Sequence, residues 1–316
     1  MYEASTDGSP TAPGESGHCL QKRILRDMSD DSSELKARDV RRRFNLAAAR
    51  FDEADFIHRR SFEGLLERLA PLLITPGHIL DLGSATGSGS RQLAKSFRKA
   101  RVISLDICGP MLTRAKAGRT MFSKTREVQA DASKLPLRTG SFDLIVANML
   151  LPWIGDLTAC FSEVARALKK GGVFTFATLG PDSLASLRHA WKLADGSNHI
   201  HTFADMHDVG DSLVRAGLTD PVLDVDKLAV AYRDTSSLFR DLSACGARNC
   251  LAERRRTLTG KRRFRAMQDN LLRTGGDGGV TVDVEIVYGH AWGSGPRSPV
   301  GEFRVDPGSI RRRREE

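Results

Sequence analysis

The sequence is most informative at His78-Ile79-Leu80-Asp81-Leu82-Gly83-Ser84-Ala85-Thr86-Gly87-Ser88-Gly89. A short apolar run ends in an acid, and a loop of small residues follows at once. This pattern is typical of a parallel strand that turns into a helix. Ligands of α/β folds bind at this edge of the sheet, and glycine lets the backbone approach them closely. The stretch therefore predicts a site for a nucleotide-like or nucleoside-like molecule.

The spacing of the glycines separates two classes of cofactor. The dinucleotide pattern Gly-x-Gly-x-x-Gly fails, because the residue three positions after Gly89 is Gln92. The pattern Asp-x-Gly-x-x-x-Gly, which begins at Asp81, instead resembles motif I of the class I methyltransferases that use S-adenosylmethionine (SAM). That family usually has a glycine where Ala85 stands. The resemblance implies SAM as the cofactor, and the alternative for this loop alone is a glycine-rich turn without a ligand.

Later features follow in the order that this family shows. The apolar run 101–105 ends in Asp106, which follows Gly83 by 23 residues, close to the spacing at which an acid meets a ribose. A carboxylate there accepts hydrogen bonds from both ribose hydroxyls. By resemblance, Asp131 would lie beside the adenine, and the segment Ser141–Asn148 matches the family's "FDLV" strand. Each acid by itself is also compatible with an ordinary strand end. The resemblance implies these cofactor-binding residues: Asp81, Gly83, Ser84, Ala85, Gly87, Asp106, Ile107, Asp131, Ala132, Asn148 and Met149.

Alternating strand and helix patterns predict the fold class. We expect an α/β, Rossmann-like class I methyltransferase with a mostly parallel seven-stranded sheet, helices on both faces and helical lid insertions. The predicted strands are 78–82, 101–105, 127–130, 142–148, 172–179, 222–225 with 228–232, and an alternating strand from 280 to 288. In the family, the last strand is antiparallel.

The chain divides into three parts by composition. Residues 1–38 are rich in Ser, Asp, Gly and Pro, so we expect a disordered tail. A methyltransferase domain is predicted over 39–292, with its core at 76–180 and lid insertions at 181–220 and 236–272. Residues 293–316 are expected to be a flexible basic tail.

Charge and cysteine content limit the function classes. The net charge is +9 and the pI about 9.6, which favours nucleic acid, anionic membranes or acidic proteins as partners. The excess is concentrated in 248–265, where Glu253 is the one acid. No apolar stretch approaches the roughly 18 residues of a membrane span, and the start of the chain lacks a secretory signal. Five cysteines without a C-x-x-C pair predict a cytoplasmic protein without a structural metal.

Three further segments indicate which group of methyltransferases the chain resembles. Val40–Asp52, Leu179–Trp191 and Leu242–Asn249 together resemble the malonyl-acyl-carrier-protein O-methyltransferases of biotin synthesis. The resemblance implies methylation of the free malonyl carboxylate, a reaction that needs no general base, and we assign no catalytic residue. It implies an acidic carrier protein as partner, for which the basic stretch is a plausible dock. Candidate contacts with the substrate or partner are Arg43, Phe44, Arg188, Arg240, Arg254, Arg255 and Arg256, and we expect a monomer.

Other functions stay open at this point. A methyltransferase acting on a quinone or another small molecule would have the same fold. So would the related mitochondrial complex I assembly factors, one of which is a hydroxylase, and a non-catalytic binding protein. Charge alone suggests nucleic-acid modification, but Asn148-Met149-Leu150-Leu151 follows the fourth strand where a Pro-Pro-Tyr or Pro-Pro-Trp motif would stand. We therefore do not expect nucleic acid as a partner.

Overall fold

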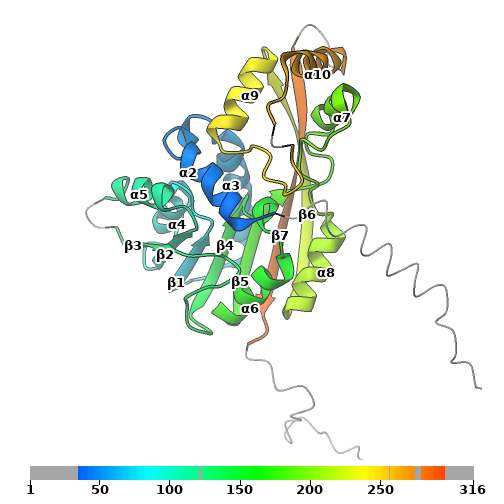
Figure 1. The fold of residues 1–316 in the computed structure, drawn as a ribbon. Helices are drawn as coiled ribbons and strands as arrows, with labels where there is room; N and C mark the ends of the chain where they lie inside the picture. The colour runs from blue at the N-terminus through cyan, green and yellow to red at the C-terminus, as the bar shows by residue number, and fades with distance from the viewer. Residues whose placement is uncertain (1–34, 121–122, 256, 275–278, 296–316) are drawn as a thin grey trace, which may run out of the picture.

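The structure is a computed structural model that describes residues 35–120, 123–255, 257–274 and 279–295. The predicted tails lie almost entirely outside these residues. The described chain forms one seven-stranded sheet of order β3-β2-β1-β4-β5-β7-β6 (Figure 1). Its strands are β1 His78–Leu82, β2 Arg101–Asp106, β3 Thr125–Gln129, β4 Phe142–Asn148, β5 Leu168–Leu179, β6 Leu218–Tyr232 and β7 Val280–Gly293.

The sheet confirms the predicted fold class. Strands β1 to β5 pair in parallel, and β7 lies antiparallel between β5 and β6. The central strands β1 and β4 are apolar and almost wholly buried, as expected of parallel strands covered on both faces. The two strands predicted at 222–225 and 228–232 are one strand, β6, with a register shift between Thr219 and Val222.

Helices cover both faces of the sheet. On one face, α6 (Leu157–Ala167) and α8 (Met206–Ala216) contribute Phe161, Val164 and Leu213 to the largest apolar cluster. On the other face, α3 (Phe56–Leu69) and α4 (Ser88–Ser96) contribute Leu65 and Leu93. Helix α8 therefore belongs to the layer that covers the sheet, although it falls inside the predicted lid insertion 181–220.

The remaining insertions form a lid on an extension of the sheet. β7 pairs with β5 only from Ile286 onward, and its earlier residues pair with β6 alone. On this extension pack α7 (Ala185–Asp195), α9 (Thr235–Ala244) and α10 (Lys261–Thr274), in a separate apolar cluster with Trp191 and Leu238. Figure 1 shows the three helices at the upper end of the sheet. The segment 236–272 is thus two helices joined by a loop.

The start of the described chain crosses the same end of the sheet. Helix α2 (Ala37–Ala47) precedes the short helix η1 (Phe51–Glu53) and α3. Leu35 forms an antiparallel bridge with Leu251 of the loop after α9. Residues 35–38, predicted as part of the tail, are therefore built into the domain. Within the described residues, no helix is long and apolar enough to cross a membrane.

Candidate functional site

A cavity of about 420 Å³ opens at the carboxyl ends of β1, β2 and β4. Its position follows from the fold, because the loops after parallel strands meet at this edge. Helix α2 closes the cavity with Val40 and Phe44, and Leu35 lies beside them. The structure brings together eight of the predicted cofactor-binding residues in its wall: Gly83, Ala85, Asp106, Ile107, Asp131, Ala132, Asn148 and Met149.

The loop after β1 takes a shape that the cofactor site requires. Gly83, Ala85 and Gly87 all have positive φ, at 77°, 45° and 76°. Ala85 thus occupies a left-handed conformation that glycine adopts more easily. The N–H groups of Gly83 and Ser84 donate to the Leu105 carbonyl of the next strand at 2.8 and 3.0 Å. The loop is therefore fixed to β2 and leaves open space above its backbone.

Two of the predicted residues support this loop without lining the main cavity. The Asp81 carboxylate is buried and accepts a 2.5 Å hydrogen bond from Ser90 of α4. Burial raises its pKa to about 6. Gly87 precedes α4, and a Cβ there would lie 2.8 Å from the Cβ of Ala115. Ser84 lines a small neighbouring hollow. Asp81 and Gly87 therefore hold the loop after β1 in position without lining the main cavity.

Asp106 has the geometry expected of a ribose ligand. One carboxylate oxygen accepts from the Ala85 N–H at 2.9 Å, and the other accepts from the Cys108 N–H at 2.8 Å. Burial raises the pKa of Asp106, and these backbone donors oppose that rise. Each carboxylate oxygen can accept a second hydrogen bond. Asp106 can therefore hold the loop after β1 and two ligand hydroxyls at the same time.

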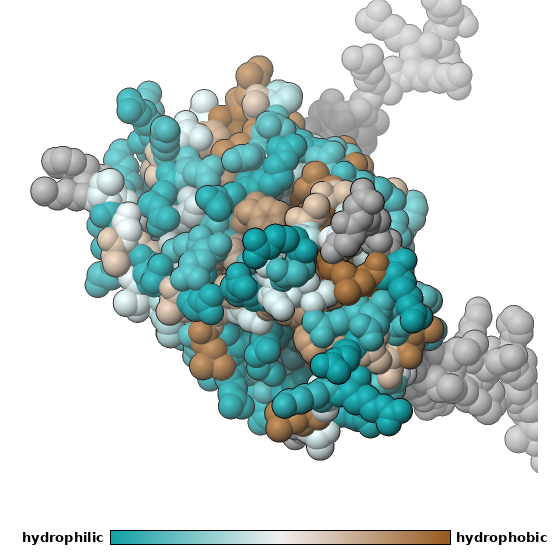
Figure 2. Space-filling model, turned by 90° about the horizontal axis from the view of Figure 1, so that it is seen from above, coloured by the Kyte–Doolittle hydropathy of each residue, from teal (hydrophilic) through white to brown (hydrophobic). Residues whose placement is uncertain are grey.

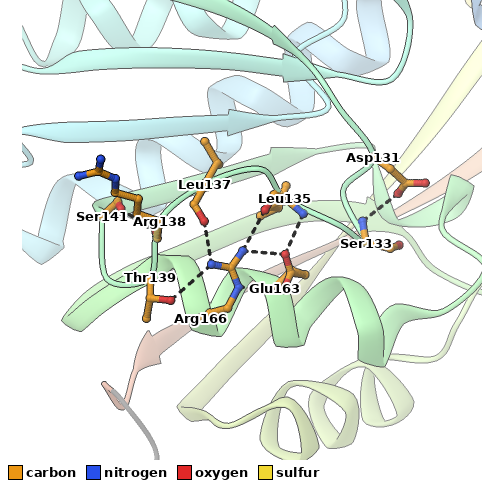
Figure 3. A network of polar contacts seen from close by, with 9 residues as sticks. All are labelled: Asp131, Ser133, Leu135, Leu137, Arg138, Thr139, Ser141, Glu163 and Arg166. Atoms are coloured by element: carbon orange, nitrogen blue, oxygen red, sulfur yellow. Dashed lines mark hydrogen bonds and ion pairs between the residues drawn. The ribbon is translucent and has the colours of Figure 1, made fainter.

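Asp131 stands on a loop that an ion pair holds in place (Figure 3). One oxygen of Asp131 accepts from the Ser133 N–H at 2.8 Å, so the other oxygen is free to accept from an amine in the cavity. Further along this loop, the Leu135 N–H donates to Glu163 at 2.7 Å, and Arg166 donates to the carbonyls of Leu135 and Leu137. Arg166 also binds Glu163, so helix α6 sets the position of the loop.

The end of β4 supplies the wall opposite the first loop. Asn148 accepts from the Ser61 hydroxyl at 2.7 Å, and its amide group donates to the His58 carbonyl at 2.8 Å. Its side chain thereby joins β4 to α3, in addition to lining the cavity. Met149 has a φ of 54°, held by a hydrogen bond from its N–H to the Ala177 carbonyl. Backbone strain of this kind is found preferentially at functional sites.

His58, which is not among the predicted site residues, lines both this cavity and a small neighbouring hollow. His58 is half-buried; its ring packs edge-on against Phe51 at 4.9 Å, and its buried Nδ1 has no hydrogen-bond partner. Burial lowers its pKa to about 4, so the ring is neutral at pH 7. A single histidine within the apolar pattern of α3 gave no signal, because its surroundings come from β4 and η1.

A second, apolar cavity of about 420 Å³ lies between the lid and the sheet edge. It shares His58, Met149 and Trp153 with the first cavity. Trp153 contacts Phe44 edge-on at 5.0 Å and His201 at 5.2 Å. Phe44, a predicted site residue, thus lines the first cavity and supports the wall between the two. Ligands in the two cavities would meet at this wall.

The predicted arginine contacts divide into two groups. Arg188 donates to the carbonyls of Pro181, Ser183 and His201 at 3.2–3.3 Å, and it lines neither cavity. Arg254 forms an ion pair with Asp39 at 3.0 Å. The buried Nε of Arg188 has no hydrogen-bond partner, and Arg240 is exposed on α9 and lines neither cavity. The roles of these arginines toward a substrate or partner stay predictions.

The other arginines line a separate hollow or are not described. Arg43 and Arg255 face a basic hollow outside the lid, and Arg256 lies outside the described residues. Among the described residues, no group of three His, Cys, Asp or Glu side chains is placed to hold a metal ion.

Comparison with known proteins gives consistent results. A family described as "Methyltransferase domain" matches residues 80–176. The Malonyl-[acyl-carrier protein] O-methyltransferase of Gallionella capsiferriformans is 40% identical over 264 residues, which are 82% of this chain and 91% of that protein. The enzyme of the same name from Halorhodospira halophila is 39% identical over 290 residues, 90% and 98% of the two chains.

The solved structures agree on the fold. The YcgJ protein from Bacillus subtilis superposes with a TM-score of 0.53 at 16% identity, over 74% of this chain and 98% of its own. At that identity, the likeness bears on the fold alone.

Proposed function

This chain belongs to the family of malonyl-[acyl-carrier protein] O-methyltransferases, and from that membership we propose that it methylates the free carboxylate of malonyl-acyl carrier protein. The product is the malonyl methyl ester of early biotin synthesis. SAM is the methyl donor, and it supplies a methyl group made electrophilic by the positive sulfur. The identity of the relatives extends over the lid and α2 as well as the sheet, so it includes the regions that would recognise the acceptor.

The residues of the first cavity fit SAM. Asp106 offers free acceptor capacity at the end of β2, and Asp131 offers an oxygen on the neighbouring loop. Gly83 and Ala85, both with positive φ angles, line the cavity with the backbone of the loop after β1. Apolar side chains such as Ile107 and Leu150 complete the wall. This set matches a nucleoside with a ribose, a base bearing an amine and an extended tail.

One observation carries the proposal: the cofactor cavity and the apolar cavity share the wall made by His58, Met149 and Trp153. An acceptor that enters through the apolar cavity would meet the methyl group at this wall. A carboxylate has a reference pKa of about 4 and is ionised at neutral pH. The carboxylate oxygen can therefore form the new bond to carbon while the carbon–sulfur bond breaks, and no group of the protein has to remove a proton.

The protein then contributes by enclosing the methyl donor and the acceptor together. Phe44, Phe51 and Trp153 enclose the cofactor cavity, and exclusion of water strengthens the attraction between the sulfonium and the carboxylate. Holding the two reactants in line replaces an encounter in solution. A quinol acceptor, the alternative, would need its hydroxyl deprotonated. His58 is a weak base for that purpose, because burial lowers its pKa to about 4.

The test is a transfer assay with radiolabelled SAM. Purified protein is incubated with malonyl-carrier protein, with acetyl-carrier protein as the matched control that lacks the free carboxylate. We expect label on the malonyl form alone, released by mild ester hydrolysis. Absence of label, with SAM bound in calorimetry, would contradict this substrate and favour a small-molecule acceptor.

The expected location and oligomeric state remain proposals. We propose a cytoplasmic monomer, in keeping with the free cysteines Cys108, Cys160, Cys245 and Cys250, since a reducing compartment preserves thiols. Light scattering of the purified protein would test the monomer.

A further inference from the structure

A strongly basic hollow lies outside the lid, between α2 and the loop after α9. Six arginines line it: Arg38, Arg42 and Arg43 from α2, and Arg248, Arg254 and Arg255 from the loop. Asp39 is the one acid in its wall, and it pairs with Arg254 at 3.0 Å and with Arg38 at 4.0 Å. Within the described part of the chain, Arg42, Arg248 and Arg255 form no ion pair with a carboxylate. The hollow therefore carries an excess of positive charge, of which Arg255 is attracted electrostatically by Asp195.

The basic hollow adjoins the apolar cavity of the lid. Both are lined by His199, Arg248, Asn249 and Thr259. The apolar cavity in turn shares His58, Met149 and Trp153 with the cofactor cavity. The three spaces thus follow one another from the outer surface to the cofactor. Seen from above, over α9 and α10, the outer surface is mostly hydrophilic, with hydrophobic side chains in small separate patches (Figure 2).

The passage between the basic hollow and the apolar cavity has fixed walls. His199 stacks on Trp191 with ring centroids 3.8 Å apart, and its Nε2 lies 2.9 Å from Asp195. The Asn249 amide donates to the Asn198 carbonyl at 2.9 Å. These contacts join the loop before α8 to the loop after α9, so the passage is formed before any ligand arrives.

The order of these spaces matches the order of groups on an acyl carrier protein. Its acyl group is attached through a phosphate, then a pantetheine chain, then a thioester. A phosphate needs arginine donors at the surface, since the guanidinium binds its oxygens in a bidentate manner. The pantetheine chain needs a mainly apolar cavity, and the acyl group on the thioester has to reach the cofactor. Arg248 is the arginine that lines both the basic hollow and the apolar cavity.

Building on the proposed function, we propose that Arg248 binds the phosphate of the carrier's phosphopantetheine arm at the entrance of the apolar cavity. The pantetheine chain then occupies the apolar cavity, and the malonyl carboxylate reaches the wall made by His58, Met149 and Trp153. Arg42 and Arg255, which are exposed on the rim, face the acidic surface of the carrier protein itself.

The test compares the malonyl thioesters of pantetheine and of phosphopantetheine, which differ by the phosphate alone. We expect the wild-type protein to prefer the phosphorylated thioester. Arg248→Ala should raise KM for that substrate about 10- to 100-fold more than KM for malonyl-pantetheine, the value of a charged hydrogen-bond pair. Arg273→Ala, which removes an exposed arginine on α10, is the matched control and should change neither.

The outcomes separate this inference from the proposed function. Turnover of malonyl-pantetheine by Arg248→Ala also shows that the variant is folded. If the wild type treats both thioesters alike, or if Arg248→Ala impairs both equally, the phosphate site is refuted while the methyltransferase function stands. If the wild type methylates neither thioester nor malonyl-carrier protein, the proposed function fails and the phosphate site with it.

A second variant tests the rim. The double substitution Arg42→Glu with Arg255→Glu should raise KM for malonyl-carrier protein at least tenfold more than KM for malonyl-phosphopantetheine, because rim charges act mainly on the encounter of two proteins. Arg254 is left intact, since its ion pair with Asp39 fixes the loop. Equal effects on both substrates would refute a protein dock at this rim.

Discussion

Replacing Asp106 by alanine tests the cofactor site most directly. The carboxylate accepts from the N–H groups of Ala85 and Cys108, and Asp106 lines the cavity with its remaining acceptor capacity. Two ribose hydroxyls bonded to a charged acceptor are worth about 1.5–3 kcal/mol each. We therefore expect Asp106→Ala to weaken SAM binding by roughly 10²- to 10⁴-fold.

The same substitution has a second, separate cost. It leaves two buried N–H groups without their acceptor, at about 1–3 kcal/mol each, offset in part because the buried carboxylate itself is removed. We expect a folded protein that is about 2 kcal/mol less stable toward urea. The structure shows why some stability is lost: Asp106 also ties the loop after β1 to β2.

Calorimetry with SAM and urea unfolding without ligand measure the two effects independently. Asp211→Ala, which removes an exposed acid on α8, is the matched control and should change neither quantity. A folded Asp106→Ala protein that binds SAM within about threefold of the wild type would refute the ribose assignment, since about threefold corresponds to less than one hydrogen bond.

Three further results are expected. Arg166→Ala should weaken SAM binding and lower the free energy of unfolding by about 1–3 kcal/mol, because it releases the loop of Asp131 from α6. Arg138→Ala, which removes an exposed arginine of the same loop, is the control. The same SAM affinity and stability in both variants would contradict the role of α6. Gly87→Ala should lower the free energy of unfolding in urea by about 2 kcal/mol, because Gly87 has a φ of 76° and its new Cβ would lie 2.8 Å from Ala115. An unchanged stability would disprove the strained turn. His58 has a folded pKa lowered to about 4 from 6.5, so the unfolded chain binds the extra proton and stability falls by about 3 kcal/mol as pH drops from 6.5 to 4. Buried Asp81, with its pKa raised to about 6, gives the opposite slope over pH 3.8 to 6. The readout is therefore the difference in slope between the wild type and His58→Gln, and equal slopes would contradict the lowered pKa of His58.

Several features of the site could be predicted from local sequence. The apolar runs that end in Asp81 and Asp106 predicted parallel strands with acids at one edge, and the structure places both acids there. The small residues between 83 and 87 predicted a turn with unusual backbone angles, and all three residues at 83, 85 and 87 have positive φ. These predictions succeed because strand burial and turn geometry depend on a few consecutive residues.

The contacts of the candidate arginines could not be predicted from local sequence. Arg188, Arg240 and Arg254 were all candidates for substrate contact by residue type and position. In the structure Arg188 holds backbone carbonyls, Arg254 pairs with Asp39 across more than 200 residues of sequence, and Arg240 is exposed. What an arginine binds depends on which groups the fold brings within reach, and its long side chain gives no periodic signal.

The sequence by itself determined the fold class and the loop of small residues after the first strand, because these depend on hydrophobic periodicity and on backbone angles within one turn. The roles of Asp106 and Asp131 toward a ribose and a base stay predictions from the family resemblance. Only the tertiary structure decided that His58 lies at the wall between two cavities, that α8 covers the sheet while α7, α9 and α10 form the lid, and that Arg248 stands at the entrance. Those placements arise from contacts between segments far apart in the chain. Their energies come from burial and pairing that no single stretch of sequence contains.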